Sequence, residues 1–192
     1  MEWSEAINEL HDLSVEFTKQ VNQLTFPASD RSRIGAALLD QSHEHAASIV
    51  LLLSRGYTGA AFALLRGQFE SAIRGFWILR CATDQDIELF KQEKLDLWAG
   101  PLIEAVEEAL GESKGLLSAI KQQAWGPLSS FVHGGFHQAV RRISEDSITP
   151  QYSDEEKSSI ATFSRFCFFL AAVETCYVAG DEDLAIAWAR RY

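Results

Sequence analysis

The sequence has little of several residue types, and each shortage excludes a class of protein. Only 3 of the 192 residues are cysteine and only 4 are proline, which excludes a disulfide scaffold and a collagen-like chain. No run approaches the roughly 20 uncharged apolar residues that a membrane-spanning helix needs. The acidic start of the chain, with Glu2 and Glu5, also lacks the basic and apolar regions of a secretory signal. These absences predict a cytoplasmic protein with no membrane partner.

The cysteines that are present favour a reducing compartment. Cys81, Cys167 and Cys176 lie inside apolar helical pattern, as small core residues do. Neither Cys167 nor Cys176 has the spacing of a metal ligand. We therefore expect buried thiols rather than disulfides.

Positive charge is scarce as well. The chain has 17 Lys and Arg against 27 Asp and Glu, a formal net charge of −10. This balance argues against a broad nucleic-acid surface, which needs clustered basic residues, without excluding a small local one. With 47% hydrophobic and 23% charged residues, the composition is that of a globular protein, and the length predicts one domain over residues 1–192.

Hydrophobic periodicity predicts an all-α protein. Apolar residues recur at helical spacing, and no segment alternates with a period of two. Four long helices are predicted at about 3–24, 30–54, 57–82 and 154–179. Short connections after the first two favour an antiparallel four-helix bundle in up-down-up-down order, with an insertion of short helices before the last long helix.

Glycine and proline predict that this insertion is irregular. Gly100-Pro101, Gly111, Gly115 and Gly126-Pro127 divide residues 93–143 into three or four short helices. Later, Ser153 and Glu156 form a capping-box pattern that opens the last long helix.

The helix at 57–82 carries the most distinctive polar pattern. Arg66, Glu70 and Arg74 follow each other at intervals of four and so share one face. One interpretation is an ion-pair ladder that fixes helix register. The other is a pocket for anion binding or acid–base chemistry, because the ladder has one cation in excess, available to a ligand or to Glu174 on the last helix.

A second candidate is the segment that ends in a glycine pair. Ser129, Ser130 and His133 precede Gly134-Gly135, and glycines permit positive φ and close approach by a ligand or another backbone. These polar groups could line a site. The structural alternative is a histidine at a helix C-terminus that is followed by a tight turn.

Metal and cofactor sites are not indicated. Asp40, His43, Glu44 and His45 form a cluster in sequence, but His43 and His45 are two positions apart and point to different sides of a helix. No Glu-x-x-His, P-loop, Gly-x-Gly-x-x-Gly or Gly-x-Ser-x-Gly motif occurs. We predict no metal and no cofactor.

Two elements together resemble a bacterial helical family of unknown function. They are Leu65-Arg-Gly-Gln-Phe-Glu70 and Ser130-Phe-Val-His-Gly134, which are similar to that family's Leu-Arg-x-x-Phe-Glu helix and Ser/Thr-x-x-His-Gly element. More distantly, the chain resembles the HEPN superfamily of helical bundles. That resemblance implies a dimeric protein that binds nucleotides or cleaves RNA and is linked to stress or phage defence. HEPN ribonucleases share an Arg four to six residues before a His, and no Arg precedes a His at that spacing here.

These observations lead to one hypothesis and one alternative. The hypothesis is a HEPN-like binding or regulatory module, homodimeric, in which Arg66, Glu70, Arg74, Ser130 and His133 hold an anionic small molecule or nucleotide. The alternative is a metal-independent phosphodiester hydrolase or ribonuclease that uses His133 as general acid–base and Arg66 to stabilise phosphate charge. Dimerisation is also suggested by two aromatic residues that we expect to be exposed, Trp3 and Trp188.

Overall fold

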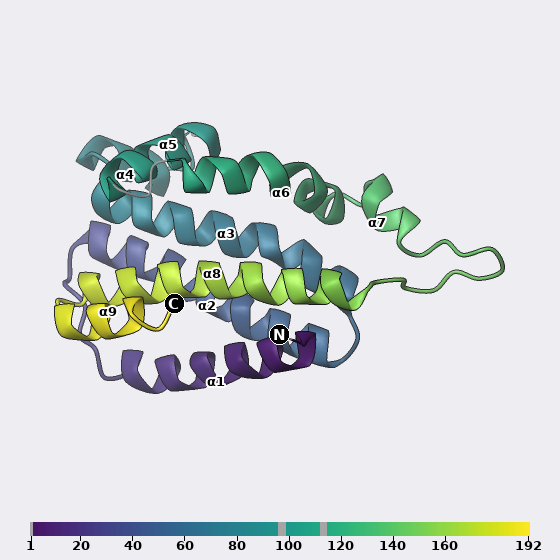
Figure 1. The fold of residues 1–192 in the computed structure, drawn as a ribbon. Coiled ribbons are helices and arrows are strands. Elements are labelled where there is room, and N and C mark those ends of the chain that lie inside the picture. Colours follow the sequence, from purple (N-terminus) through teal and green to yellow (C-terminus); the bar gives the residue numbers. More distant parts are fainter. Residues whose placement is uncertain (1, 96–98, 112–114) are drawn as a thin grey trace.

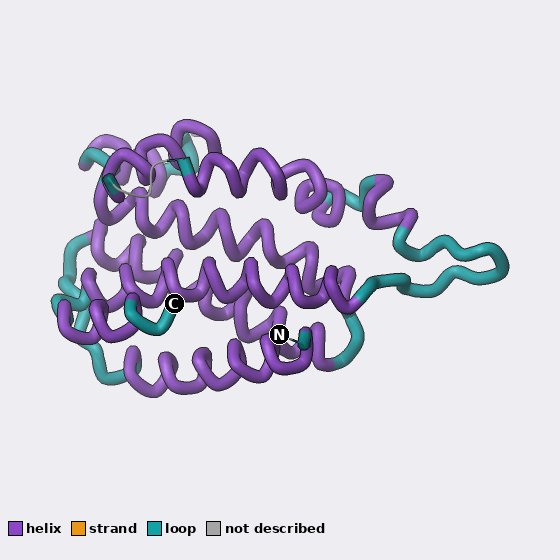
Figure 2. The backbone as a smooth tube through the Cα atoms, in the orientation of Figure 1, coloured by secondary structure: helices purple, strands orange, loops and turns teal. Residues whose placement is uncertain are grey.

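The computed structural model describes residues 2–95, 99–111 and 115–192, and within these ranges the chain is helical (Figures 1 and 2). The only β pairing there is an isolated bridge between Ile143 and Ile148. The all-α prediction is therefore confirmed. The helices of the described ranges are α1 (Trp3–Val21), α2 (Asp30–Ser54), α3 (Thr58–Arg80), α4 (Asp84–Lys91), α5 (Ala99–Leu110), α6 (Leu116–Val132), α7 (Phe136–Val140), α8 (Asp154–Val178) and α9 (Glu182–Ala189).

Local signals at the helix starts explain why the long helices begin where they do. The Ser153 hydroxyl accepts a hydrogen bond from the Glu156 N–H at 3.2 Å, and the Glu156 carboxylate accepts one from the Ser153 N–H at 2.9 Å. This is the predicted capping box. The Ser29 hydroxyl likewise accepts from the Ser32 N–H at the start of α2.

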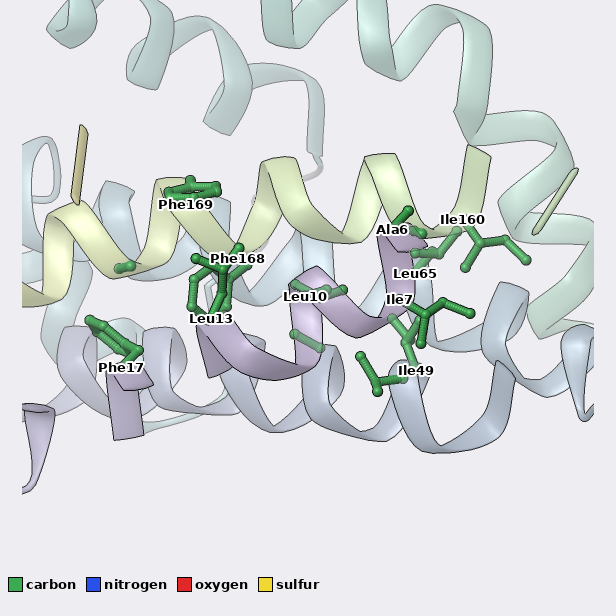
Figure 3. Packing of buried hydrophobic residues seen from close by; sticks show 14 of the residues in the cluster. Ala6, Ile7, Leu10, Leu13, Phe17, Ile49, Leu65, Ile160, Phe168 and Phe169 are labelled. Atoms are coloured by element: carbon green, nitrogen blue, oxygen red, sulfur yellow. The ribbon is translucent and has the colours of Figure 1, made fainter. Parts of the chain in front are cut away.

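The main core lies between α1, α2, α3 and α8 (Figure 3). The apolar residues of α1 recur at helical spacing, and the face that they form is buried in this core. Burying such a face removes about 25 cal/mol of unfavourable hydration per Å². Buried core residues drawn in Figure 3 include Ile7, Leu10, Leu13, Phe17, Ile49, Leu65, Ile160 and Phe168.

Helix α8 runs in the same direction as α3, which differs from the predicted antiparallel order. The Gln68 side chain donates to the Ser164 carbonyl at 2.9 Å, and further along both helices Arg80 Nε donates to Glu174 at 2.6 Å. Both pairs advance toward the C-terminus together, so the two helices are parallel. The reason is α6, which returns the chain along α3 before α8 begins (Figure 1).

The return is possible because α6 is one helix of 17 residues that continues through Gly126-Pro127. The prediction that this pair ends a helix is wrong. Proline removes one backbone hydrogen bond, whose carbonyl belongs to Gln123 four residues earlier. Both Gln123 and Pro127 are exposed, so water can satisfy the freed carbonyl. Gly100-Pro101 likewise lies inside the first turn of α5, where proline is tolerated. Part of the predicted insertion, residues 96–98 and 112–114, lies outside the described residues.

Two glycines allow α2 and α3 to approach closely. A Cβ at Gly75 would lie 3.1 Å from the Gly35 carbonyl oxygen, and a Cβ at Gly35 would lie 2.4 Å from Leu79 Cγ. Both distances are too short for an ordinary side-chain contact. These glycines are therefore packing residues.

Helix α8 is the one described helix that is long and apolar enough to cross a membrane, but 61% of its apolar window is buried within the protein. The two cysteines of α8, Cys167 and Cys176, are buried and form no disulfide, as predicted. Burial raises the pKa of both thiols, that of Cys176 to about 11. Cys81 is unbridged and partly buried.

One expectation about exposed aromatic residues is wrong. Trp188 is only 1% exposed, because α9 folds back onto α1 and α8. The indole N–H of Trp188 donates to the Gln20 side chain at 2.9 Å. Trp3 is partly buried, with the Lys157 ammonium 4.6 Å above its ring. Neither residue supports dimerisation.

Candidate functional site

The guanidinium of Arg66 lies at the centre of a polar cluster between α3 and α6. Its Nε donates to Glu70 at 2.7 Å, and its Nη1 donates to the Ser129 hydroxyl at 3.1 Å. The same Nη1 lies 3.3 Å from His133 Nε2. Since arginine is always a donor, Nε2 is the acceptor in this contact, and a neutral His133 carries its proton on Nδ1. Arg66, Glu70 and His133, which the sequence analysis assigns to one site, therefore lie next to one another in the structure.

The indole ring of Trp125 completes the cluster. Arg66 Cζ lies 4.6 Å from the ring centroid, so the ring stacks against the cation. Trp125, Ser129 and His133 follow each other at intervals of four on α6. We call these three residues, together with Arg66 and Glu70, the α3–α6 site.

Trp125 is absent from the sequence-based hypothesis, and Ser129 is named beside the glycine pair but not among the residues expected to hold the ligand; the spacing of α6 identifies both. A helix that continues through Gly126-Pro127 places Trp125 and Ser129 on the same face as His133. The predicted break at that pair separated Trp125 from the serines and hid the stripe.

Ser130 belongs to a turn and not to the site. Its hydroxyl accepts from the His137 N–H at 3.1 Å, and its carbonyl accepts from the Gly135 N–H at 2.7 Å. A Cβ at Gly135 would lie 2.5 Å from Ser130 Oγ, while Gly134 has a φ of +65°. The glycine pair is therefore explained by the turn between α6 and α7, where the backbone approaches a serine rather than a ligand.

Arg74 also lies apart from the site. Its side chain is exposed and lines a different hollow, beside Trp77 and Lys91. Within the described ranges it makes no ion pair with Glu70, whose carboxylate is turned toward Arg66. The predicted three-residue ladder is a single Arg66–Glu70 pair.

The sequence suggests Glu174 as a partner for the surplus cation of that ladder, but in the structure Glu174 has another partner. Its carboxylate binds Arg80, with Oε1 at 2.6 Å from Nε and Oε2 at 3.2 Å from Nη2. Arg80 lies 14 positions after Arg66 on α3, about 20 Å along the helix axis. The two arginines therefore serve separate places.

The histidines of α2 have structural surroundings. His43 lies against Phe17 and Phe168, with ring centroids 4.4 Å and 5.0 Å away, and burial lowers its pKa to about 3. His45 packs on α3 where a Cβ at Gly67 would come within 3.0 Å of its ring, and burial lowers its pKa too. In the part of the chain that the structure describes, no three His, Cys, Asp or Glu residues are grouped to hold a metal.

The exposure of the α3–α6 site allows a ligand to reach it. The side chains of Arg66 and Glu70 are 23% and 28% exposed, and His133 is exposed. A guanidinium, a hydroxyl and an imidazole therefore converge at the surface. Together they supply hydrogen-bond donors, which are the groups that recognise phosphate or carboxylate.

Residues 39–191 match the model of a family described as "Family of unknown function (DUF6988)", and the chain belongs to this family. The match covers both α3 and α6 and agrees with the predicted likeness to a helical family of unknown function. It carries no assignment to the HEPN superfamily. No curated protein and no solved structure matches the chain.

Proposed function

We propose that this member of the DUF6988 family is a binding module whose α3–α6 site holds an anionic group of a small molecule. The observation that supports this most is the convergence of Arg66 Nη1 with the Ser129 hydroxyl and the exposed His133 imidazole. Glu70 and the Trp125 ring fix the guanidinium from two other sides. A cation held in place before binding loses little entropy when it receives an anion.

The geometry indicates how an anion would enter. Arg66 Nη1 now donates toward His133 Nε2, a contact that protonation of the imidazole breaks because Nε2 then becomes a donor. An anion inserted between them accepts from both groups. Binding should therefore replace the direct contact between these two atoms with hydrogen bonds to the anion, with an imidazole proton on Nε2.

Isothermal titration calorimetry with inorganic phosphate and with adenosine monophosphate tests the proposal. Wild-type protein should bind at least one of these probes saturably, and Arg66→Ala should abolish the heat. Arg74→Ala is the matched control, since it removes an exposed arginine from the same helix and should leave binding unchanged. Equal binding by wild type and Arg66→Ala would overturn the proposal.

A phosphodiester hydrolase is the alternative, favoured by the placement of one imidazole beside one guanidinium. In that reaction His133 would exchange the proton and Arg66 would stabilise the phosphate charge. Turnover of bis(p-nitrophenyl) phosphate that His133→Gln abolishes would support it. Binding of phosphate or adenosine monophosphate without turnover would support the binding module. For such a module, the corresponding cellular hypothesis is a HEPN-like role in stress or phage defence.

We also propose that the protein is a homodimer. The support comes from exposed apolar residues between the end of α6 and the start of α8. The loop in this segment projects beyond the bundle in Figure 1. Sedimentation should show a dimer that Phe136→Asp with Ile148→Asp converts to monomer, and a wild-type monomer would contradict the proposal. These exposed residues are Val132, Phe136, Val140, Ile143 and Ile148, at 40% to 76% exposure.

A further inference from the structure

A second concave surface lies at the other end of α3. It is a groove of about 690 Å³ between the ends of α3, α5 and α8, closed on one side by the C-terminal residues. Its walls are mostly aromatic and aliphatic. We call it the Arg80 groove, and its defining residues are Phe76, Arg80, Phe169, Val173, Glu174 and Tyr177.

The groove contains a charged pair of unequal burial. The Glu174 side chain is 5% exposed and the Arg80 side chain 45%. Burial raises the pKa of Glu174 while its bonds to Arg80 oppose that rise. Arg80 Cζ also lies 5.3 Å from the Tyr177 ring centroid. A carboxylate in an apolar hollow, held by one arginine, is thus surrounded by aromatic walls.

Stability alone does not account for this pair. Replacing a buried ion pair with apolar residues of similar volume is often neutral or stabilising, so such pairs are weak evidence for a stabilising role. An apolar hollow with a few polar groups and a shifted pKa is instead the usual form of a small-molecule site. Its volume also falls within the roughly 300–1,000 Å³ typical of such sites.

The hydrogen bonds of the pair indicate the chemistry of the ligand's head. Both oxygens of Glu174 accept from Arg80, which uses Nε and Nη2 for this. Among the described residues, Glu174 is the hydrogen-bond partner of the Arg80 side chain, and Nη1, which carries two N–H donors, takes no part in these bonds. The groove therefore offers the N–H donors of Arg80 Nη1 to a ligand, while both buried carboxylate oxygens of Glu174 already accept hydrogen bonds.

We propose that the Arg80 groove binds an amphipathic monocarboxylate, with its apolar body against the aromatic walls and its carboxylate on Arg80 Nη1. The site is separate from the α3–α6 site, because Arg66 and Arg80 are about 20 Å apart along α3. The failure of either proposal thus leaves the other standing.

A fluorescent probe and a head-group series test this assignment. 8-Anilinonaphthalene-1-sulfonate, which joins an aromatic body to an anionic head, should bind wild-type protein saturably and become brighter. Decanoate, decanol and decylamine then compete for it. Decanoate should displace the probe with about tenfold higher affinity than decylamine, the value of one charge-assisted hydrogen bond. Equal displacement by all three would overturn the choice of a carboxylate.

Two matched variants locate the binding. Val173→Trp fills the Arg80 groove from α8 and should weaken decanoate at least about tenfold. Val15→Trp places the same bulk in the groove between α1 and α2, which lacks a charged pair of this kind, and should leave affinity unchanged. Loss in Val15→Trp with retention in Val173→Trp would place the ligand elsewhere and contradict the proposal.

A third variant keeps the test valid if Val173→Trp does not fold, which circular dichroism will show. Tyr177 is 38% exposed at the edge of the groove, so Tyr177→Ala removes part of the wall with little loss of core packing. Folded Tyr177→Ala should bind decanoate more weakly than wild type. Unchanged affinity in this variant, or no saturable binding by wild type, would overturn the proposal.

Discussion

Two arginines on one helix, Arg66 and Arg80, each bind one carboxylate, and the two pairs differ in where that carboxylate comes from. Arg66 binds Glu70 on its own helix, and both side chains are partly exposed. Arg80 binds Glu174 on α8, whose carboxylate is almost completely buried. The first pair needs only a formed helix. The second exists only when α3 and α8 have docked.

This difference separates a pair that lies near solvent from a pair that joins two core helices and also lines a groove. The Arg66 pair leaves its cation near solvent, beside the exposed His133, where a ligand can replace a neighbour at low cost. The Arg80 pair joins two core helices, and breaking it isolates a buried charge. Stability measurements should therefore distinguish the two arginines, while binding of inorganic phosphate or adenosine monophosphate should depend on Arg66 and not on Arg80.

The largest effect is expected for Arg80→Ala. The variant should lose about 3 kcal/mol of unfolding free energy, at the low end of the range for breaking a buried pair, because half-exposed Arg80 is partly hydrated already. Urea denaturation followed by circular dichroism measures this loss. Arg74→Ala, the exposed control on the same helix, should change stability by less than about 0.5 kcal/mol. A similar small loss for Arg80→Ala would mean that Glu174 is not held as described.

A smaller effect is expected from pH, which should change the unfolding free energy that Arg80→Ala loses. The pKa of folded Glu174 is raised by burial above the ordinary 4.5. The stability linked to this group is therefore fully present below about pH 4.5 and is lost as the pH rises through the raised pKa. Removing Arg80 raises that pKa further, since its bonds lower it.

The difference in unfolding free energy between wild type and Arg80→Ala should thus be wide at about pH 7 and narrow toward pH 4.5, because the raised pKa leaves the Glu174 carboxyl more than half protonated there in both folded proteins. Denaturation curves of both proteins at the two pH values measure the gap. Arg80→Ala with Glu174→Gln is the control, because it has no titrating carboxylate at position 174 and its stability should depend less on pH. A gap of constant width would contradict the assigned role of Glu174.

The smallest effect is expected for Arg66→Ala. An ion pair between partly exposed side chains contributes about 0–1 kcal/mol, and the contact with Trp125 adds about 0.5–1 kcal/mol. The variant should remain folded and lose about 1 kcal/mol in the same denaturation measurement. A loss above about 3 kcal/mol would identify the pair as a structural one and remove the basis of the proposed anion site.

The same two arginines show how much the sequence could predict. Local rules were sufficient for the helices, for the cap at Ser153 and for the Arg66–Glu70 pair, because each depends on residues a few positions apart. The direction of α8 and the partner of Glu174 depend on how helices that are distant in the sequence pack together. Hydrophobic periodicity does not predict that packing.

The candidate site was predictable in part for the same reason. Arg66, Glu70 and His133 were identified from their residue types, and the structure brings them together. Ser129 was passed over for Ser130, because the choice between neighbouring serines depends on the rotation of α6, and that rotation depends on the helix continuing through Pro127.

A crystal structure of the protein with sodium tungstate, a strongly scattering stand-in for phosphate, tests the central claim most directly. We predict tungsten density at the α3–α6 site, with oxygens within hydrogen-bond distance of Arg66 Nη1 and His133 Nε2 and the direct contact between these two atoms opened. A structure that keeps that contact closed with no density beside it, at tungstate concentrations that occupy other surface sites, would contradict the account.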